Sequence, residues 1–181
     1  WLVMLDEQRR MEPRIAAFAN KYVYKGLLRN HPSTLKSREK IVASALFPGE
    51  AINLIDLTSN YCAAGKNSDN SRYNILSAVI SFCIALKTEK SEDIRDVSII
   101  TPYAAQTRLI RALILDYRQN GNTELRCATV HQFQGSESDV IIFDAVESYP
   151  SRKPGWLMGK DFYLILRLIN VAVTRAKGKL I

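Results

Sequence analysis

The spacing of apolar residues along the chain predicts four helices separated by strands and loops. Residues 13–24 place apolar side chains at helical intervals, and Pro13 suits the first turn of a helix. Three later segments show the same helical spacing: residues 74–86, the stripe from Leu109 to Tyr117, and residues 162–176. Each of these helices has an apolar face that must pack against a core.

Short apolar runs between these helices predict strands. The runs lie at residues 52–57, 97–101, 127–130, 140–146 and 179–181. The fourth run is almost entirely apolar, as expected for a strand that is covered on both faces. Two stretches predict loops: the polar and basic residues 29–40, and residues 58–72, which are rich in Ser, Asn and Gly.

Strands that alternate with helices of this length predict β-α-β units. The expected fold class is therefore α/β, an open and mostly parallel sheet with helices on both faces. In such sheets ligands collect at the carboxyl ends of the strands. The residues just after Thr101, Val130 and Val146 are accordingly where we expect function.

Length and composition favour a single domain over residues 1–181. The chain has 181 residues and 47% hydrophobic content, enough to bury one sizeable core. It begins at Trp1 and ends at Ile181 directly after a basic turn, so we expect a fragment of a longer polypeptide. No run approaches the roughly 20 apolar residues that span a bilayer, and no signal pattern opens the chain. We expect a soluble, intracellular domain without a membrane partner, cytoplasmic or, in a eukaryote, nuclear.

The cysteines argue against a disulfide framework and against a zinc site. Their number is odd, and Cys62, Cys83 and Cys127 are widely spaced without a Cys-x-x-Cys pair. Buried thiols are the expectation, because free cysteine is usually buried. No metal-ligating residues are assigned in the chain.

The charge of the chain favours an anionic partner. The formal net charge is +7, with an isoelectric point near 9.4, and neutralisation of phosphates by Lys and Arg drives non-specific nucleic-acid binding. Many equally basic domains bind no nucleic acid, so the charge alone leaves the partner open.

Four separated segments resemble, in order, the motifs of the second RecA-like lobe of superfamily 1 helicases, especially the branch with the nonsense-mediated-decay helicase. Residues 5–13 read LDEQRRMEP where the family has Leu-x-x-Gln-Tyr-Arg-Met-His-Pro. Residues 99–106, IITPYAAQ, resemble the strand-to-loop segment that touches the nucleic-acid backbone. Residues 128–142, ATVHQFQGSESDVII, resemble motif V, and residues 170–177, NVAVTRAK, resemble motif VI, Asn-Val-Ala-x-Thr-Arg-Ala.

The resemblance implies a RecA-like P-loop NTPase fold and the C-terminal motor lobe of an ATP-dependent helicase or translocase. Such a lobe binds ATP and Mg²⁺ jointly with an N-terminal RecA-like lobe of the same polypeptide, and it tracks single-stranded RNA or DNA. This chain lacks its own phosphate-binding loop, because Gly65-Lys66 is followed by Asn67 and no glycine stands five positions before Gly65. The phosphate cradle and magnesium ligands must come from the first lobe, so we expect the isolated chain to be inactive.

Arg10 and Arg175 are the candidate catalytic residues. Phosphoryl transfer is catalysed mainly by positioning and by stabilising charge on the γ-phosphate, and an arginine reaching in from a second unit contributes strongly. Guanidinium grips phosphate oxygens with two N–H groups, which lysine does not. The family's equivalent arginines act in this way across the cleft between the lobes.

Four further residues are candidates for nucleotide binding. Glu137 matches the family glutamate that bonds the nucleotide ribose, and Gln134 and Gly135 shape the same turn. Glycine permits close approach of the backbone there. Arg9 stands where the family has a tyrosine that stacks on the base, and a guanidinium plane can also stack.

The candidate nucleic-acid contacts follow two strand ends. Thr101, Pro102, Tyr103 and Thr129 place hydroxyls and backbone groups beyond those ends, suited to phosphate contacts that ignore base identity. Tyr103 either stacks on a base or packs as a helix-start tyrosine. His131, which stands where many relatives have Asp, either bonds locally or contacts nucleic acid.

Two competing functions belong to other classes. A degenerate lobe would act as a non-catalytic nucleic-acid-binding or protein-docking module, which the retained Arg10, Glu137 and Arg175 disfavour. A free-standing dinucleotide-binding fold lacks its glycine-rich strand-to-helix turn here. Within the motifs, Leu168 replaces a second family arginine, and Asn74 or Ser71 is expected to cap a helix locally.

Overall fold

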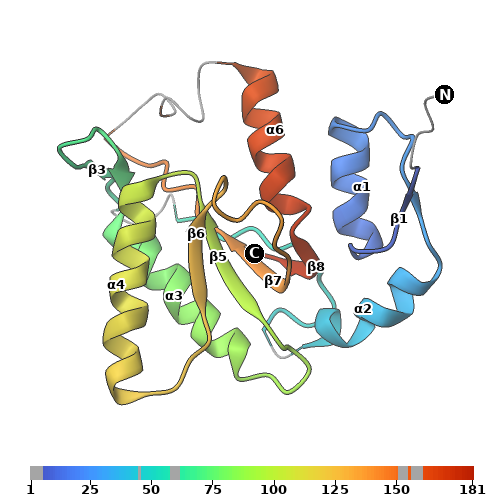
Figure 1. Cartoon of the computed structure of the whole chain (residues 1–181), viewed down its shortest axis with the longest axis horizontal. Helices are drawn as coiled ribbons and strands as arrows, with labels where there is room; N and C mark the ends of the chain where they lie inside the picture. The colour runs from blue at the N-terminus through green and yellow to red at the C-terminus, as the bar shows by residue number, and fades with distance from the viewer. Residues whose placement is uncertain (1–5, 45, 58–61, 151–154, 156–160) are drawn as a thin grey trace.

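A parallel sheet forms the centre of the computed structural model, which describes residues 6–44, 46–57, 62–150, 155 and 161–181 (Figure 1). Within these residues the sheet has four strands in the order β6-β5-β7-β8. They are β5 (Val97–Thr101), β6 (Arg126–Thr129), β7 (Ser138–Phe143) and β8 (Ala176–Leu180). Every neighbouring pair runs parallel. The predicted α/β class is therefore confirmed, and the arrangement is that of a RecA-like fold.

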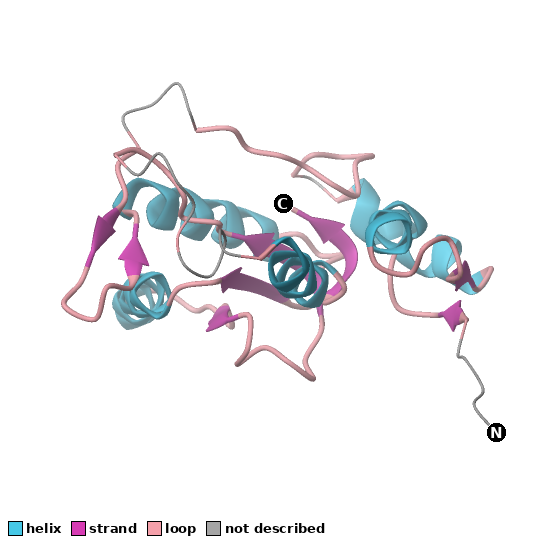
Figure 2. Cartoon of the chain, turned by 90° about the horizontal axis from the view of Figure 1, so that it is seen from above, coloured by secondary structure: helices cyan, strands magenta, loops and turns pink. Residues whose placement is uncertain are grey.

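Helices cover both faces of the sheet, as the view from above makes plain (Figure 2). Helices α1 (Pro13–Tyr22) and α6 (Phe162–Val173) pack on one face. Helices α3 (Ile75–Glu89) and α4 (Ala104–Asn120) pack on the other. Side chains alternate along a strand, so Ile100 joins the first core and Ile99 the second. The apolar spacing in the sequence predicts all four of these helices.

Smaller elements flank this sandwich. Strand β1 (Glu7–Gln8) pairs in parallel with β2 (Arg29–Asn30) beside α1. Strand β3 (Gly65–Lys66) pairs antiparallel with β4 (Arg72–Tyr73). The Gly-Lys pair thus lies in a hairpin strand and does not open a helix.

The prediction of a loop over residues 29–40 is wrong. Strand β2 is followed there by helix α2 (Ser33–Ala43), which packs beside β8. The buried residues of α2 are Thr34, Ile41 and Val42, spaced at intervals that place them on one helical face. The intervening basic side chains conceal this narrow stripe in the sequence. Helices with so little apolar character owe their stability to tertiary packing.

The prediction of a strand over residues 52–57 is also wrong. Ile52 forms only an isolated bridge with Leu180, supported by a bond from Asn53 N–H to the Leu180 carbonyl at 2.8 Å. Strand β8 ends at Leu180, so the residues after Asn53 have no strand beside them with which to pair. Leu54 is 93% exposed as a result. Of the predicted loop over residues 58–72, residues 58–61 lie outside the described part.

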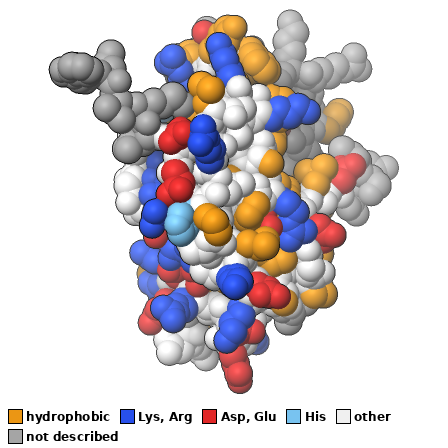
Figure 3. Space-filling view, turned by 90° about the vertical axis from the view of Figure 1, so that its right-hand side faces the viewer, with side chains coloured by type: hydrophobic (Ala, Val, Ile, Leu, Met, Phe, Trp, Pro, Cys, Tyr) orange, Lys and Arg blue, Asp and Glu red, His pale blue; other side chains and the backbone are white. Residues whose placement is uncertain are grey.

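The surface bears on three further expectations. Cys83 is exposed, which contradicts the expectation of three buried thiols, while Cys62 and Cys127 are buried. On the face formed by the N-terminal elements, Lys and Arg side chains are dispersed, with acidic side chains between them (Figure 3). The positive charge therefore makes no continuous stripe on that face. None of the described helices is long and apolar enough to cross a membrane.

Candidate functional site

Three charged residues from distant parts of the sequence meet at the amino-terminal ends of β7 and β8. The Nε of Arg10 lies 2.7 Å from Oε2 of Glu137, and Nη1 of Arg10 donates to the Thr174 carbonyl at 3.3 Å. The Nη1 of Arg175 donates to the Ser136 carbonyl at 3.4 Å. We call Arg10, Glu137 and Arg175 the arginine cluster. Both catalytic candidates and the ribose candidate are thus brought together.

Arg10 is positioned by a turn that Gln8 organises. The Gln8 amide oxygen accepts from the N–H groups of Arg10 and Met11 at 3.0 and 2.8 Å, and its Nε2 donates to the Met11 carbonyl. Met11 is buried in the core beneath. The N–H of Glu12 then donates to the Lys177 carbonyl at 2.7 Å, which ties the segment to β8. Arg10 is held beside β8 by these backbone contacts.

Glu137 is positioned by a loop that returns from the end of β6 to the start of β7. Phe133 is buried and anchors this loop to the core under α6. Gly135 has a φ of +90°, in the left-handed region that favours glycine. A Cβ there would meet nothing within 4 Å, so the backbone angle alone calls for glycine. Gln134 is exposed on the same turn.

Arg175 lies in the short turn between α6 and β8. Thr174 closes the helix by donating its hydroxyl to the Asn170 carbonyl at 2.7 Å, and the Arg175 Nε donates to the Val171 carbonyl. Partial burial lowers the pKa of Arg175, and the neighbouring Arg10 cation lowers it further while Glu137 opposes the shift. Two guanidinium groups therefore face one carboxylate, and this excess of positive charge favours an anionic ligand.

A second group of charges adjoins the arginine cluster and was not assigned from the sequence. The Lys177 Nζ lies 3.4 Å from Asp139 and 3.7 Å from both Asp96 and Glu137. We call Lys177, Asp96 and Asp139 the lysine group. The sequence indicates only the position of Lys177 at the end of motif VI, because Asp96 comes from the residue before β5 and meets Lys177 only in the fold.

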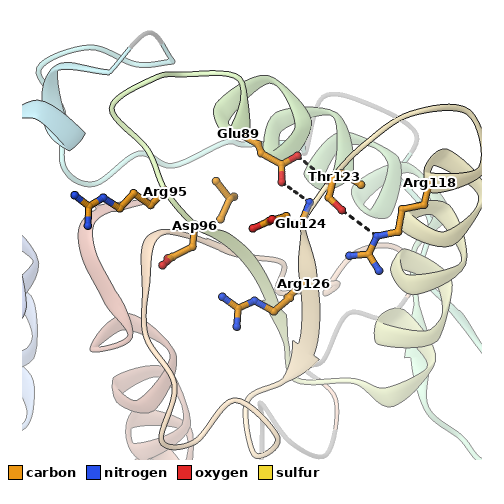
Figure 4. A pocket seen from close by; sticks show the side chains of 8 residues that line it. Glu89, Arg95, Asp96, Arg118, Thr123, Glu124 and Arg126 are labelled. Carbon is orange, nitrogen blue, oxygen red and sulfur yellow. Dashed lines mark hydrogen bonds between the residues drawn. The ribbon is translucent and has the colours of Figure 1, made fainter.

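The lysine group borders a pocket of about 340 Å³ at the starts of β5 and β6 (Figure 4). Arg95, Asp96 and Arg126 are among its lining residues. On its far side Glu89 accepts from the Thr123 hydroxyl and the Glu124 N–H, at 2.5 and 2.8 Å. Opposite charges balance around this pocket, so it does not share the positive excess of the arginine cluster.

Arg9 does not join the arginine cluster. Its guanidinium pairs with Glu7 at 2.9 Å, and its side chain is 67% exposed. It lies next to Arg10 in the chain but turns to the neighbouring strand β1. Its contact with a nucleotide base stays a prediction.

The candidate nucleic-acid residues lie at the opposite end of the sheet, where β5 and β6 end. Thr101 and Thr129 are direct neighbours in the parallel register. Thr101 and Pro102 are buried, and the Thr101 hydroxyl accepts from the Tyr103 N–H at 3.4 Å. His131 is exposed just after β6. The candidate residues thus lie at both ends of the sheet, because the arginine cluster is at the amino ends of β7 and β8 and not at the carboxyl ends where we expect function.

Tyr103 is a packed residue at the start of α4. Its ring is buried, and its hydroxyl donates to Glu147, which also pairs with Arg72. Burial, followed by the bond to Glu147, raises the pKa of the Tyr103 hydroxyl. In this arrangement the ring is not free to stack on a base. The structure therefore shows the packed alternative for this side chain.

The same end of the sheet is held by a buried polar network. Asp144, just after β7, accepts from Gln106 at 2.6 Å and from Ser77 at 3.1 Å. Asn74 caps α3 by accepting from the Ser77 N–H, as expected. Ser71 instead accepts from the Ala105 N–H at 3.0 Å and so caps α4. These bonds fix the starts of both helices next to the strand ends.

The donor chemistry of the arginine cluster suits phosphate and not a metal ion. Among the described residues there is no group of three or more His, Cys, Asp or Glu that could hold a metal. Guanidinium groups bind phosphate oxygens in fixed geometry.

Comparison with known proteins finds a matching family model and similarity to proteins named as helicases. The family model described as AAA domain matches residues 2–181. The chain is 32% identical over 97% of its length to DNA polymerase alpha-associated DNA helicase A of Schizosaccharomyces pombe, of which it covers 27%. It is 31% identical to the DNA replication ATP-dependent helicase/nuclease DNA2 of Gallus gallus, and 28% identical to helicase sen1 of S. pombe. In both cases 99% of the chain is matched, and it covers 16% and 10% of these relatives.

Proposed function

The chain belongs to the AAA domain family, and from this membership we propose that it is the second motor lobe of an ATP-dependent nucleic-acid helicase or translocase. In this proposal residues 1–181 form the C-terminal RecA-like lobe of a longer protein. Its relatives named as helicases are four to ten times longer, which leaves room for a first lobe. The similarity to these helicases and the parallel sheet support the assignment.

The arginine cluster carries the proposal. Arg10 comes from the segment before α1 and Arg175 from the turn before β8, yet both contact the Ser136 to Glu137 backbone or side chain. Two arginines from separate segments of the sequence contact the same loop, and such a pair of guanidinium groups suits a multiply charged anion such as a triphosphate. In the closed cleft Arg10 and Arg175 would stabilise the charge that develops on the γ-phosphate.

Glu137 is proposed to bond the ribose hydroxyls. A carboxylate accepts hydrogen bonds from hydroxyl groups, and Glu137 is part exposed beside the two arginines. Gln134 and Gly135 lie on the same turn and would border the nucleotide. Arg9 is proposed to leave its exposed ion pair with Glu7 and approach the base of the nucleotide. Exposed ion pairs contribute little to the free energy of folding, so little is lost when this one breaks.

The other end of the sheet is proposed to contact a single strand of RNA or DNA. Thr129 is the last residue of β6 and His131 follows it, and the Thr101 to Tyr103 segment at the end of β5 would contribute backbone groups. Such contacts serve any sequence, as a translocase requires. The arginine cluster lies at the starts of β7 and β8 and these residues at the ends of β5 and β6, so a change at the nucleotide end would reach the strand through the one sheet that all four strands form.

The rest of the reaction is assigned to the first lobe. That lobe would supply the phosphate-binding loop, the residue that activates water, and the ligands of the Mg²⁺ ion that neutralises phosphate charge. Closure of the cleft would bring Arg10 and Arg175 to the phosphates. The isolated chain is accordingly proposed to be inactive as an ATPase.

ATP turnover by the full-length protein, with matched single-stranded RNA and DNA of the same sequence, tests the proposal. We expect turnover to rise at least tenfold with one or both strands, as in a motor whose two ends are coupled. The control is the same protein with Arg126→Ala, an exposed arginine on the opposite edge strand of the sheet, which should behave as the unaltered protein. Absence of turnover with either strand would favour a non-catalytic module instead.

A further inference from the structure

Glu137 is held only by other side chains. Its Oε2 meets Arg10 at 2.7 Å and its Oε1 lies 3.7 Å from the Lys177 Nζ. Among the described residues no backbone N–H donates to its carboxylate. The side chain is 43% exposed. Without these two cations it would gain rotamer freedom, which opposes a fixed contact.

Arg10, the partner of Glu137 at 2.7 Å, is the one that a bound nucleotide would draw away from it. The Arg10 guanidinium uses its Nε for Glu137 and one terminal nitrogen for the Thr174 carbonyl. If Arg10 turns to the phosphates, its bond to Glu137 is exchanged for bonds to phosphate oxygens. Glu137 must then be held by another group at the moment when it is needed for the ribose.

Lys177 is fixed independently of any nucleotide. Asp139 accepts from the Arg95 N–H at 3.0 Å, and its own N–H donates to Asp96 at 2.6 Å. These backbone bonds fix both carboxylates that face Lys177. The Lys177 side chain is only 19% exposed, so its ammonium is confined among Asp96, Asp139 and Glu137.

We propose that Lys177 is a positioning residue, which holds Glu137 in place for the nucleotide ribose when Arg10 turns toward the phosphates. The proposal rests on the proposed function, because it assumes that Glu137 bonds the ribose. Lys177 itself touches no substrate. Its distance from Glu137 shortens when Arg10 leaves, because the carboxylate then has one cationic neighbour from the lysine group and none from Arg10.

The test measures how well the full-length protein discriminates ATP from 2′,3′-dideoxy-ATP, as the ratio of the two kcat/KM values. Glu137→Gln should lower this ratio roughly tenfold, because a bond between a charged group and the ribose is lost. Lys177→Met should lower it roughly threefold, and Lys177→Arg should restore it. Lys177→Met added to Glu137→Gln should lower it no further, since both act on one contact.

A merely structural role of Lys177 would reduce kcat/KM for both nucleotides equally and leave the ratio unchanged. If the ratio is unchanged in Lys177→Met but lowered in Glu137→Gln, the role of Lys177 is overturned while the ribose contact of Glu137 stands. An unchanged ratio in Glu137→Gln would instead overturn the ribose contact in the proposed function. Lys66→Met, at an exposed position in β3, is the control and should keep the ratio.

Loss of Lys177 leaves Asp96 and Asp139 without their cation, so folding of Lys177→Met is checked by urea unfolding. If that variant unfolds, Lys177→Met is combined with Asp139→Asn. The asparagine oxygen still accepts from the Arg95 N–H while one negative charge is removed. The same threefold fall in the ratio is expected for this double variant, and an unchanged ratio would again contradict the role of Lys177.

Discussion

At the scale of single residues, charged side chains are part exposed at one end of the sheet and buried at the other. In the arginine cluster the charged groups are part exposed and pair with one another, so they can exchange partners with a ligand. At the opposite end Asp144 is buried at 5% exposure and bonded on all sides by protein donors. A carboxylate enclosed in this way serves structure, because exchange of its partners would cost the full desolvation of the group.

The titration of Asp144 gives a prediction at this scale. Burial raises its pKa from 3.8, and the bonds from Gln106 and Ser77 oppose the shift without cancelling it. Between 3.8 and the raised value the folded state binds the proton more tightly, so the contribution of Asp144 to stability falls as the pH rises through that window. Asp144→Asn removes the titration.

The stability of Asp144→Asn relative to the unaltered chain should therefore improve as the pH rises above 3.8. Urea unfolding of both proteins over a pH series measures this difference. A difference that is constant with pH would mean that Asp144 titrates equally in the folded and unfolded states. The exposed carboxylate Asp69, changed to Asn, provides a matched control.

At the scale of elements, β8 depends on a close approach to α2. A Cβ at Gly178 would lie 2.5 Å from Cγ2 and 2.6 Å from Cβ of Ile41. Ile41 is branched at Cβ and stiff in a helix, so it cannot swing aside. Gly178→Ala should therefore push α2 from the sheet and lower the free energy of unfolding by about 1–3 kcal/mol.

Thermal unfolding checks this loss of stability by comparing Gly178→Ala with Gly121→Ala. A Cβ at Gly121 meets the ring of Tyr117, which sits at the end of α4 and can rotate away. The Gly121 variant should thus lose less stability. Equal losses in the two variants would show that the α2 contact tolerates extra volume.

How far the sequence predicts these elements depends on how completely each is buried. Strand β5 is buried at all five positions and shows an uninterrupted run, so periodicity was sufficient to find it. Helix α2 buries three residues among basic ones, and the 52–57 run is apolar without being paired. In both cases tertiary contacts decide the outcome, and local composition points the other way.

The candidate site shows the same division. Arg10, Glu137 and Arg175 were selected by their resemblance to family motifs, and the fold brings all three together. Lys177 and Asp96 could not be paired in advance, because they are 81 positions apart and meet only through the register of the sheet. The burial of Tyr103 likewise depends on Glu147 and Arg72, which no motif includes.

At the scale of the whole molecule, the described residues contain one wall of the proposed cleft. In the two-lobe account the phosphate-binding loop and the residue that activates water belong to the first lobe. Residues 1–181 alone should therefore hydrolyse no ATP above the protein-free rate, with or without single-stranded RNA or DNA. A phosphate-release assay measures this, and stimulated turnover by the chain alone would contradict the two-lobe account.

Arg175 provides the most direct test of the central claim, that this lobe supplies arginines to the γ-phosphate. In the full-length protein, Arg175→Lys keeps the charge but loses the forked geometry of guanidinium. The measurement is single-turnover ATP hydrolysis with saturating single-stranded nucleic acid, alongside the affinity for ATP. We predict that hydrolysis slows by about a hundredfold or more while affinity changes by less than about tenfold. Hydrolysis at the unaltered rate would contradict the account.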